Sequence, residues 1–286
     1  GERPTNDKLT HAKSAGADME MEKRVYQSSN PLNHFKIVQL PFYHTSPLSP
    51  NLSQLTYPKN LTHLPKMPAI LEDPSTRNPP PKAHTDAAPT LTARETTLPK
   101  FSSAPMTLYP ITGGPQTVPK DLIKFLHEEF SAEILRGGTY PMMEPMALDQ
   151  FADYWFGTFA VVAILDDEGQ GLREGRDWKS VCMGTFYTKP NYPGRCSHVC
   201  NGGFLTTTAA RGKGVGQAMG EAYLDFAPRL GYTYSVFNLV FANNPASIRI
   251  WEKLGFSVIG RVPKAARLAN SEELVDALIF GRELGN

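Results

Sequence analysis

The hexapeptide Arg-Gly-Lys-Gly-Val-Gly at residues 211–216 stands between an apolar run of strand length, residues 199–206, and a segment whose apolar residues have helical spacing. A strand, a glycine-rich turn and a helix in this order are typical of a phosphate site. Backbone N–H groups and the positive end of the helix dipole converge there without obstruction by Cβ atoms. The order therefore favours a pyrophosphate cradle, with a plain connecting turn as the alternative.

The hexapeptide differs from two familiar nucleotide loops. No Gly-Lys-Ser/Thr sequence follows it, as a P-loop requires, and the spacing Gly-X-Gly-X-X-Gly with an opening β-α-β unit is absent. The phosphate group that it binds should therefore belong to another kind of ligand.

Apolar periodicity on both sides of the hexapeptide predicts an α/β (α+β) fold, in which a mixed central sheet carries flanking helices. One expected helix begins at Pro119, and the others cover residues 148–155, 215–226 and 245–254. The expected strands are 106–111 at one edge, 158–165, 181–188, 199–206, 234–241, 257–262 and 274–282.

Residues 1–98 have a different composition. Most of the 25 prolines of the 286-residue chain lie before residue 120, and proline removes backbone donors and fixes φ. We predict a proline-rich, largely irregular arm over 1–98 and the folded domain over 99–286. The arm is either a solvated segment or an extended one that wraps the domain or pairs with a neighbour, through residues 34–40.

Composition excludes several classes of protein. The 29 basic and 28 acidic residues lack the basic excess of a nucleic-acid-binding protein. No apolar run approaches the ~20 residues that cross a membrane. Three cysteines are too few for a secreted disulfide framework, which favours a reducing compartment. We expect a cytoplasmic protein, with a mitochondrial pool as the alternative, and no metal site.

The pattern Arg-X-X-Gly-X-Gly at 211–216, followed by Asn244 and by Leu-Gly-Phe at 254–256, resembles the GNAT superfamily of acetyl-CoA-dependent N-acetyltransferases. Over residues 119–284 the chain is similar to the fungal azetidine-2-carboxylate N-acetyltransferases. The segments that carry this similarity are 184–187, 189–192, 195–198, 203–205, 237–241 and 260–263. The resemblance implies acetyl-CoA as co-substrate, a small cyclic imino acid as acceptor, a role in detoxification or stress tolerance, and a homodimer.

The resemblance also implies that the strand before the hexapeptide separates from its neighbour, so that pantetheine pairs with its backbone. An amide of Leu205 or Thr206 would then polarise the thioester carbonyl. Gly202 and Gly203 suit a bulge that starts the separation, or else a close packing contact. The residues predicted to bind the cofactor are Phe204, Leu205, Thr206, Arg211, Gly212, Lys213, Gly214, Val215, Gly216 and Asn244.

The catalytic residues depart from those of many GNAT relatives, which use a glutamate on this strand and a tyrosine on a later helix. Asn201 and Trp251 stand at those positions, and an indole cannot donate a phenolic proton. By resemblance we predict Asn201 and Asn238 at the substrate and Asn244 at the sulfur of CoA. Asn244 also fits a helix cap before Pro245.

Three nearby features have competing interpretations. Cys196, His198 and Cys200 alternate, but a structural zinc site needs four ligands and no second pair exists. His198 is either a general base or an ordinary hydrogen-bonded histidine. Tyr187 and Tyr192 either line the substrate pocket or pack as plain aromatics.

Three other functions compete with acetylation of an imino acid. The acceptor would be another small amine or a protein terminus, or the domain would bind acetyl-CoA without catalysis, since the usual glutamate and tyrosine are missing. The third is an interaction protein built on the proline-rich arm.

Overall fold

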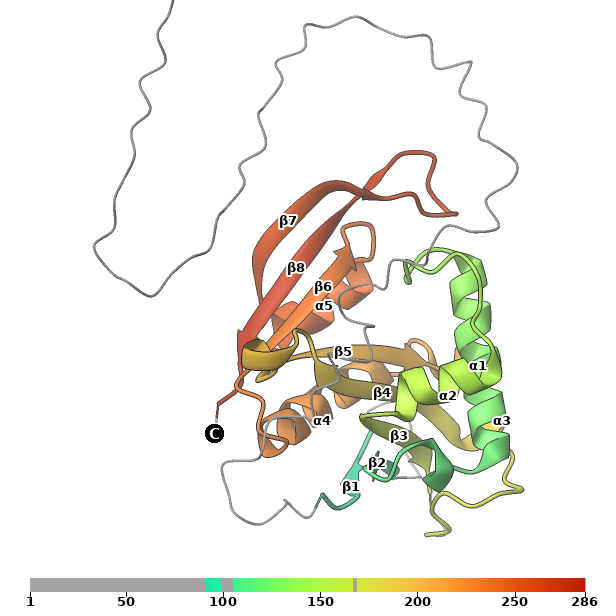
Figure 1. The fold of residues 1–286 in the computed structure, drawn as a ribbon. Helices are drawn as coiled ribbons and strands as arrows, with labels where there is room; N and C mark the ends of the chain where they lie inside the picture. The colour runs from blue at the N-terminus through green and yellow to red at the C-terminus, as the bar shows by residue number, and fades with distance from the viewer. Residues whose placement is uncertain (1–90, 99–104, 167–168, 286) are drawn as a thin grey trace, which may run out of the picture. The chain divides into compact units, whose positions relative to one another are not determined.

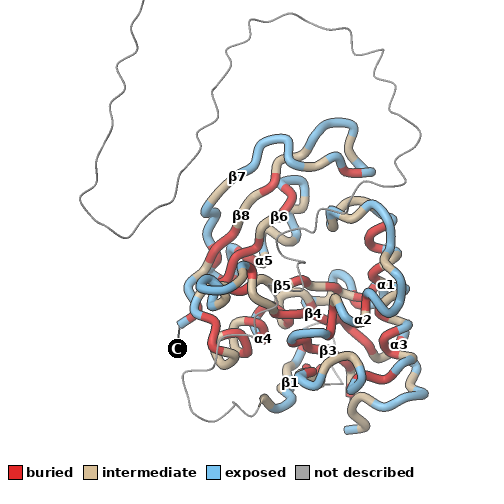
Figure 2. Tube along the Cα trace, in the orientation of Figure 1, coloured by how far each residue is buried: buried red, intermediate tan, exposed pale blue. Residues whose placement is uncertain are grey.

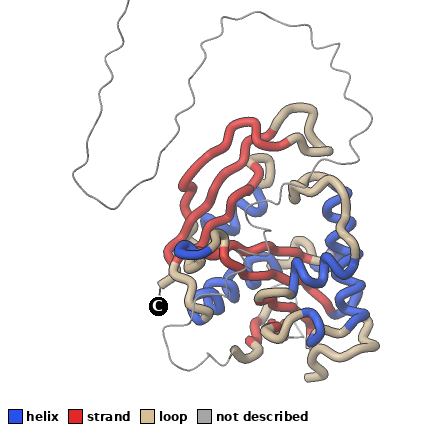
Figure 3. The backbone as a smooth tube through the Cα atoms, in the orientation of Figure 1, coloured by secondary structure: helices blue, strands red, loops and turns tan. Residues whose placement is uncertain are grey.

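The computed structural model describes residues 91–98, 105–166 and 169–285. These residues form an eight-stranded sheet with helices packed on it (Figures 1 and 3). Residues 1–90 and 99–104 of the predicted arm and domain start lie outside the described residues. The strands are β1 (Arg94–Thr96), β2 (Met106–Ile111), β3 (Phe159–Leu165), β4 (Cys182–Pro190), β5 (Val199–Thr206), β6 (Tyr234–Phe241), β7 (Ser257–Ala266) and β8 (Val275–Glu283).

Four of the five described α-helices fall where apolar periodicity predicts them, and the short helix at residues 178–181 was not predicted. The α-helices are α1 (Lys120–Arg136), α2 (Leu148–Phe156), α3 (Trp178–Val181), α4 (Val215–Arg229) and α5 (Pro245–Lys253). Short 3-10 turns cover Pro115–Thr117, Gly194–Cys196 and Thr208–Ala210. Gly137 ends α1 in the left-handed region at φ 62°, where glycine has no Cβ penalty. The predicted α/β sheet with flanking helices is confirmed.

The strands follow the order β1-β2-β3-β4-β5-β6-β8-β7. Neighbours are antiparallel except β5 and β6, which run parallel. Residues 106–111 were predicted as an edge strand, but β1 pairs with them, Arg94 opposite Leu108. The sheet thus begins within residues 1–98, the range predicted as the arm. The three residues of β1 carry no apolar periodicity that could have predicted a strand.

Two apolar cores lie on opposite faces of the sheet. On β3, Phe159, Val161 and Ala163 face the core under α4 and α5. The alternate residues Ala160, Val162 and Ile164 face the core under α1 and α2. Figure 2 shows the buried centre of the sheet, while β7 at its edge is mostly exposed. Residues of β4 and β5 therefore present side chains alternately to the two helical layers.

The sheet separates between β5 and β6. Only Val199 with Tyr234 and Cys200 with Ser235 are paired, although each strand has eight residues. From Asn201 onward, β5 keeps its pairing with β4 but has none with β6. This is the predicted separation, and it exposes one backbone edge of β5 to a cleft.

The loop between β7 and β8 touches the end of α1. The amide of Ala269 donates to the carbonyl of Gly137 at 2.9 Å. Leu268 is buried against Phe241 and Ala277. The far half of the sheet and the α1–α2 connection are thereby joined at one end of the cleft.

Among the described residues, no helix has both the length and the apolar character needed to cross a bilayer.

Candidate active site

A cleft of about 2040 Å³ opens where β5 and β6 separate. Its walls come from β4, β5 and β6, from the connection between α1 and α2, and from the start of α5. The hexapeptide at residues 211–216, the glycine loop, also contributes. Of the residues predicted for the site, all but Lys213 line this cleft. Their neighbours there include Glu133, Thr139, Tyr140, Tyr154, Tyr187, Lys189, Asn191 and Trp251.

The glycine loop has the backbone that a phosphate cradle needs. Gly212 and Gly214 have φ angles of 71° and 88°, which L side chains rarely adopt. A Cβ added at either residue would meet no atom of the described residues within 4 Å, so these residues leave the space before the loop open. Gly214 is the N-cap of α4, and among the described residues no side chain caps the start of that helix. The amides of its first turn are therefore placed to receive an anion.

Arg211 and Lys213, the two cations of the hexapeptide, do not both face the space proposed for the phosphates. Arg211 forms an ion pair with Glu133 of α1, whose side chain is 11% exposed. Lys213 does not line the cleft as the structure describes it. The charge of Arg211 is thus partly neutralised by the carboxylate of Glu133. The loop therefore offers a ligand mainly backbone N–H groups.

Gly202 and Gly203 are sites of close packing. The register between β4 and β5 continues without a shift through both residues, so the bulge suggested for them does not interrupt this pairing. A Cβ on Gly203 would lie 2.4 Å from the ring of Tyr187, and one on Gly202 would lie 2.8 Å from the ring of Tyr223. The two glycines let one aromatic ring lie against each face of β5.

Three asparagine side chains from three strands or their ends are joined by hydrogen bonds. Asn191 follows β4 and is buried at 1% exposure. Its Oδ1 accepts from Nδ2 of Asn201 at 3.0 Å and from Nδ2 of Asn238 at 2.6 Å. The pairing of β6 with β8 is irregular between Phe237 and Val240, which is where Asn238 lies. The amide cluster thus sits beside the point where the sheet opens.

Asn191 was missed as a site residue. Its stretch, residues 189–192, contributed to the family resemblance, but nothing in the spacing showed that its side chain points at Asn201 and Asn238. The signal that could have identified Asn191 is its position. It is a polar residue directly after β4, and the strand paired with β4 carries Asn201. That position puts polar groups on one face.

Asn244 is the cap of α5. Its side-chain oxygen accepts from the amide of Ser247 at 3.2 Å. Asn244 also lines the cleft at the start of α5, and its Nδ2 is a hydrogen-bond donor there. The cap interpretation is confirmed. Because the cap uses the side-chain oxygen of Asn244, the predicted contact with the CoA sulfur falls to its amide nitrogen.

Trp251 belongs to an aromatic cluster. Its ring centroid lies 4.8 Å from that of Phe204 and 4.5 Å from that of Phe237. These rings form the apolar side of the cleft on the α5 side of β5. The indole therefore shapes the wall and supplies no proton.

Three tyrosine hydroxyls face the cleft from the other side. Tyr140 donates to the carbonyl of Phe204 at 2.7 Å, and the hydroxyls of Tyr154 and Tyr187 lie 2.9 Å apart. Burial raises the pKa of Tyr140 and of Tyr187 well above the ordinary value. Both phenols stay protonated at neutral pH, and the hydroxyl of Tyr140 acts as a hydrogen-bond donor. Tyr187 lines the cleft and also packs on Trp155 at 5.0 Å.

The cysteine and histidine alternation does not form one site. Cys196 is exposed in a 3-10 turn, whereas Cys200 is buried on β5 with its sulfur 3.0 Å from the hydroxyl of Tyr223. His198 is exposed and does not line the described cleft. It is therefore not positioned as a general base. Tyr192, 43% exposed, lies at the rim.

The model described as the acetyltransferase (GNAT) family matches residues 132–256. The N-acetyltransferase aca1 of Schizosaccharomyces pombe is 43% identical over 166 residues, which are 56% of this chain and 79% of aca1. The chain belongs to the GNAT family of acetyltransferases. It is an acetyl-CoA-dependent N-acetyltransferase.

Solved GNAT structures share its fold. A GCN5-related N-acetyltransferase from Kribbella flavida is 26% identical with a TM-score of 0.50, over 62% of this chain and 98% of that one. The yncA protein of Salmonella typhimurium, solved with its cofactor acetyl-CoA, is 17% identical with a TM-score of 0.50, over 63% of this chain and 95% of that one.

The residues of the cleft fit acetyl-CoA. The open space before Gly212 and Gly214 suits the pyrophosphate, and the unpaired edge of β5 after Cys200 suits the amides of pantetheine. Acetyl-CoA supplies an activated acyl group as a thioester. This GNAT domain supplies the backbone donors, the apolar wall and the polar pocket beside them.

Proposed function

We propose that this acetyltransferase acetylates the ring nitrogen of a small cyclic imino acid, azetidine-2-carboxylate or a related proline-like compound. The observation that supports the proposal is the amide cluster of Asn191, Asn201 and Asn238 beside the open edge of β5. Amide groups donate and accept hydrogen bonds without titrating, so they suit a small polar acceptor. The resemblance over residues 119–284 points to the same acceptor class.

The proposed reaction is direct transfer. The neutral ring nitrogen attacks the thioester carbon, the C–N bond forms and the C–S bond breaks. The proton lost by nitrogen goes to water, and the departing thiolate takes a proton. A β5 amide at Leu205 or Thr206 stabilises the developing oxyanion, a kind of contribution worth roughly 3 kcal/mol in other enzymes. Asn201 and Asn238 hold the acceptor, and Nδ2 of Asn244 hydrogen-bonds the sulfur.

The acceptor is tested by release of free thiol from acetyl-CoA over a panel of amines. The panel contains azetidine-2-carboxylate, proline, acyclic amino acids, a polyamine, an aminoglycoside and a peptide with a free amino terminus. Selective turnover of the cyclic imino acids supports the proposal. Preference for another amine contradicts the acceptor class, and cofactor binding without turnover of any amine contradicts catalysis on a small molecule.

We further propose that two copies associate through the edge of the sheet. β7 is the last strand, and it exposes Val258, Ile259 and Val262 at 49%, 52% and 42%. An exposed apolar edge strand is a ready surface for pairing with another chain. Light scattering on the intact protein should give the mass of a dimer, and Ile259→Lys should give a monomer.

A cellular role in removing toxic proline analogues, or in stress tolerance, follows from this acceptor class. Deleting the gene should sensitise cells to azetidine-2-carboxylate, and unchanged growth would contradict the role.

A further inference from the structure

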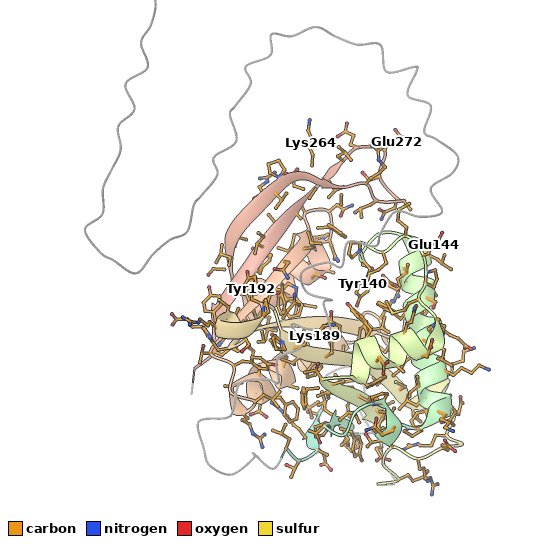
Figure 4. All side chains as sticks on the ribbon, in the orientation of Figure 1. Tyr140, Glu144, Lys189, Tyr192, Lys264 and Glu272 are labelled. Atoms are coloured by element: carbon orange, nitrogen blue, oxygen red, sulfur yellow. The ribbon has the colours of Figure 1, made fainter. Side chains whose placement is uncertain are left out.

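Lys189 occupies a distinctive position in the cleft. It lies on β4 directly opposite Asn201 of β5. Cross-strand partners in an antiparallel pair have Cβ atoms about 4.5–5.5 Å apart on the same face. Figure 4 labels Lys189 on β4 and Tyr140 on the connection between α1 and α2. Both residues line the cleft.

The ammonium of Lys189 rests against tyrosine rings. Its Nζ lies 3.8 Å from the ring centroid of Tyr154 and 4.1 Å from that of Tyr187. The same nitrogen lies 3.5 Å from the backbone carbonyl of Tyr154. Cation–π contacts within about 6 Å attract an ammonium group. These contacts hold the ammonium group against the rings of two tyrosines that line the cleft.

The described lining of the cleft contains few charged side chains. The charged residues among its described lining are Glu133, Asp153, Lys189 and Arg211. Glu133 and Arg211 form an ion pair beside the glycine loop. Asp153 is exposed on α2. Lys189 is thus the cation beside Asn201, at the end where an acceptor approaches the edge of β5.

We propose that Lys189 binds the carboxylate of the acceptor and makes this enzyme selective for amino or imino acids over plain amines. This inference rests on the proposed function. An ammonium group and amide N–H donors together match a carboxylate, because hydrogen bonds to charged groups are stronger than those between neutral groups. The same positive charge disfavours acceptors that carry a protonated amine and no carboxylate.

The test compares two acceptors of the same ring, azetidine-2-carboxylate and azetidine-2-carboxamide, on Lys189→Met and Lys189→Arg. Methionine keeps a long apolar stem but removes the charge. For Lys189→Met we expect the KM of the carboxylate to rise about ten- to a hundredfold. The KM of the carboxamide and that of acetyl-CoA should change less than about threefold. Lys189→Arg keeps the charge and should retain the preference for the carboxylate.

Lys179→Met removes an exposed lysine of α3 outside the cleft and serves as the control. Equal losses on both acceptors for Lys189→Met would show that Lys189 only holds the tyrosines, and would overturn the inference. An unchanged preference for the carboxylate would overturn it too, while the proposed function would stand. If the wild type turned over neither acceptor, both would fail. Should Lys189→Met not fold, loss of the carboxylate preference in Lys189→Gln tests the same point.

Discussion

The guanidinium of Arg211 donates to the carboxylate of Glu133 at 2.5 Å. This pair joins the glycine loop to α1, a helix that ends at Arg136, far earlier in the chain. Glu133 also accepts from the hydroxyl of Thr139 at 2.6 Å, in the connection that carries Tyr140. One buried carboxylate therefore fixes both the phosphate end and the acceptor end of the cleft.

Replacing Glu133 with glutamine should weaken cofactor binding. Burial works to raise the pKa of Glu133, but hydrogen bonds from Thr139 and Arg136 and the charge of Arg211 hold the pKa below its ordinary value. The carboxylate is thus ionised at neutral pH. Without it Arg211 loses its anchor, and the KM of acetyl-CoA should rise about five- to tenfold, on the order of 1 kcal/mol for a partly exposed pair.

Glu128→Gln changes an exposed residue of the same helix and should leave that KM unchanged. Equal KM values in the two variants would show that Arg211 needs no anchor.

Gly214→Val should abolish tight binding of acetyl-CoA. Its φ of 88° places any L side chain in the left-handed region, at a cost of about 1–2 kcal/mol, and the added atoms would fill the space proposed for the phosphates. Calorimetric titration with acetyl-CoA should show a loss of affinity of at least about tenfold.

Gly175→Val is the matched control, because Gly175 has φ 84°, lies in the β3–β4 connection, and also has nothing within 4 Å of an added Cβ. It should lose a similar amount of stability and bind acetyl-CoA normally. Normal binding by Gly214→Val would remove the loop from the cofactor site.

Asn191→Ala should act through Asn201 and Asn238. It removes the acceptor oxygen that both amides share, so we expect the KM of the amine acceptor to rise about tenfold while that of acetyl-CoA stays the same. In a double-mutant cycle with Asn201→Ala, residues in one network couple by about 0.5–3 kcal/mol. Additive effects would mean that the three amides work independently.

Asp166→Asn should destabilise the fold in a pH-dependent way. Burial works to raise the pKa of Asp166, but hydrogen bonds from Tyr109, from the amides of Gly171 and Gln170 and from Arg176 lower it below the ordinary value. Because the pKa falls on folding, the stabilisation is fully present above the unfolded pKa of about 4 and is lost as pH falls through the folded pKa.

At pH 7 the loss should be on the order of 3 kcal/mol, since Arg176, 8% exposed, keeps a buried charge. Denaturant unfolding at several pH values measures the difference between wild type and variant, which should shrink below about pH 4. A constant difference would contradict the linkage.

Most of the order of elements could be predicted from the sequence, because most of the helices and strands carry an apolar pattern of helical or strand length. The run Val199–Thr206 became β5 with the same bounds, and Tyr234–Phe241 became β6. The strand Arg94–Thr96 could not be predicted, since three residues carry no period and their pairing with β2 is set by tertiary contact.

Within the site, residue types were predicted better than their partners. The glycines of the loop and Asn201, Asn238 and Asn244 line the cleft. The local pattern predicted the loop, whereas the family resemblance predicted the asparagines. The partner of Arg211 and the role of Asn191 depend on contacts between distant segments, which no local pattern encodes. Gly203 is similar, since its closeness to Tyr187 appears only once β4 and β5 are paired.

The central claim is that this GNAT domain transfers acetyl to the ring nitrogen of a cyclic imino acid. The most direct measurement incubates the protein with acetyl-CoA and L-azetidine-2-carboxylate and detects the product by mass spectrometry. We predict an N-acetylated product in the same molar amount as the thiol released, and its loss in Gly214→Val. Acetyl-CoA bound by the wild type, with no N-acetylated product and no thiol above the level without acceptor, would contradict the claim.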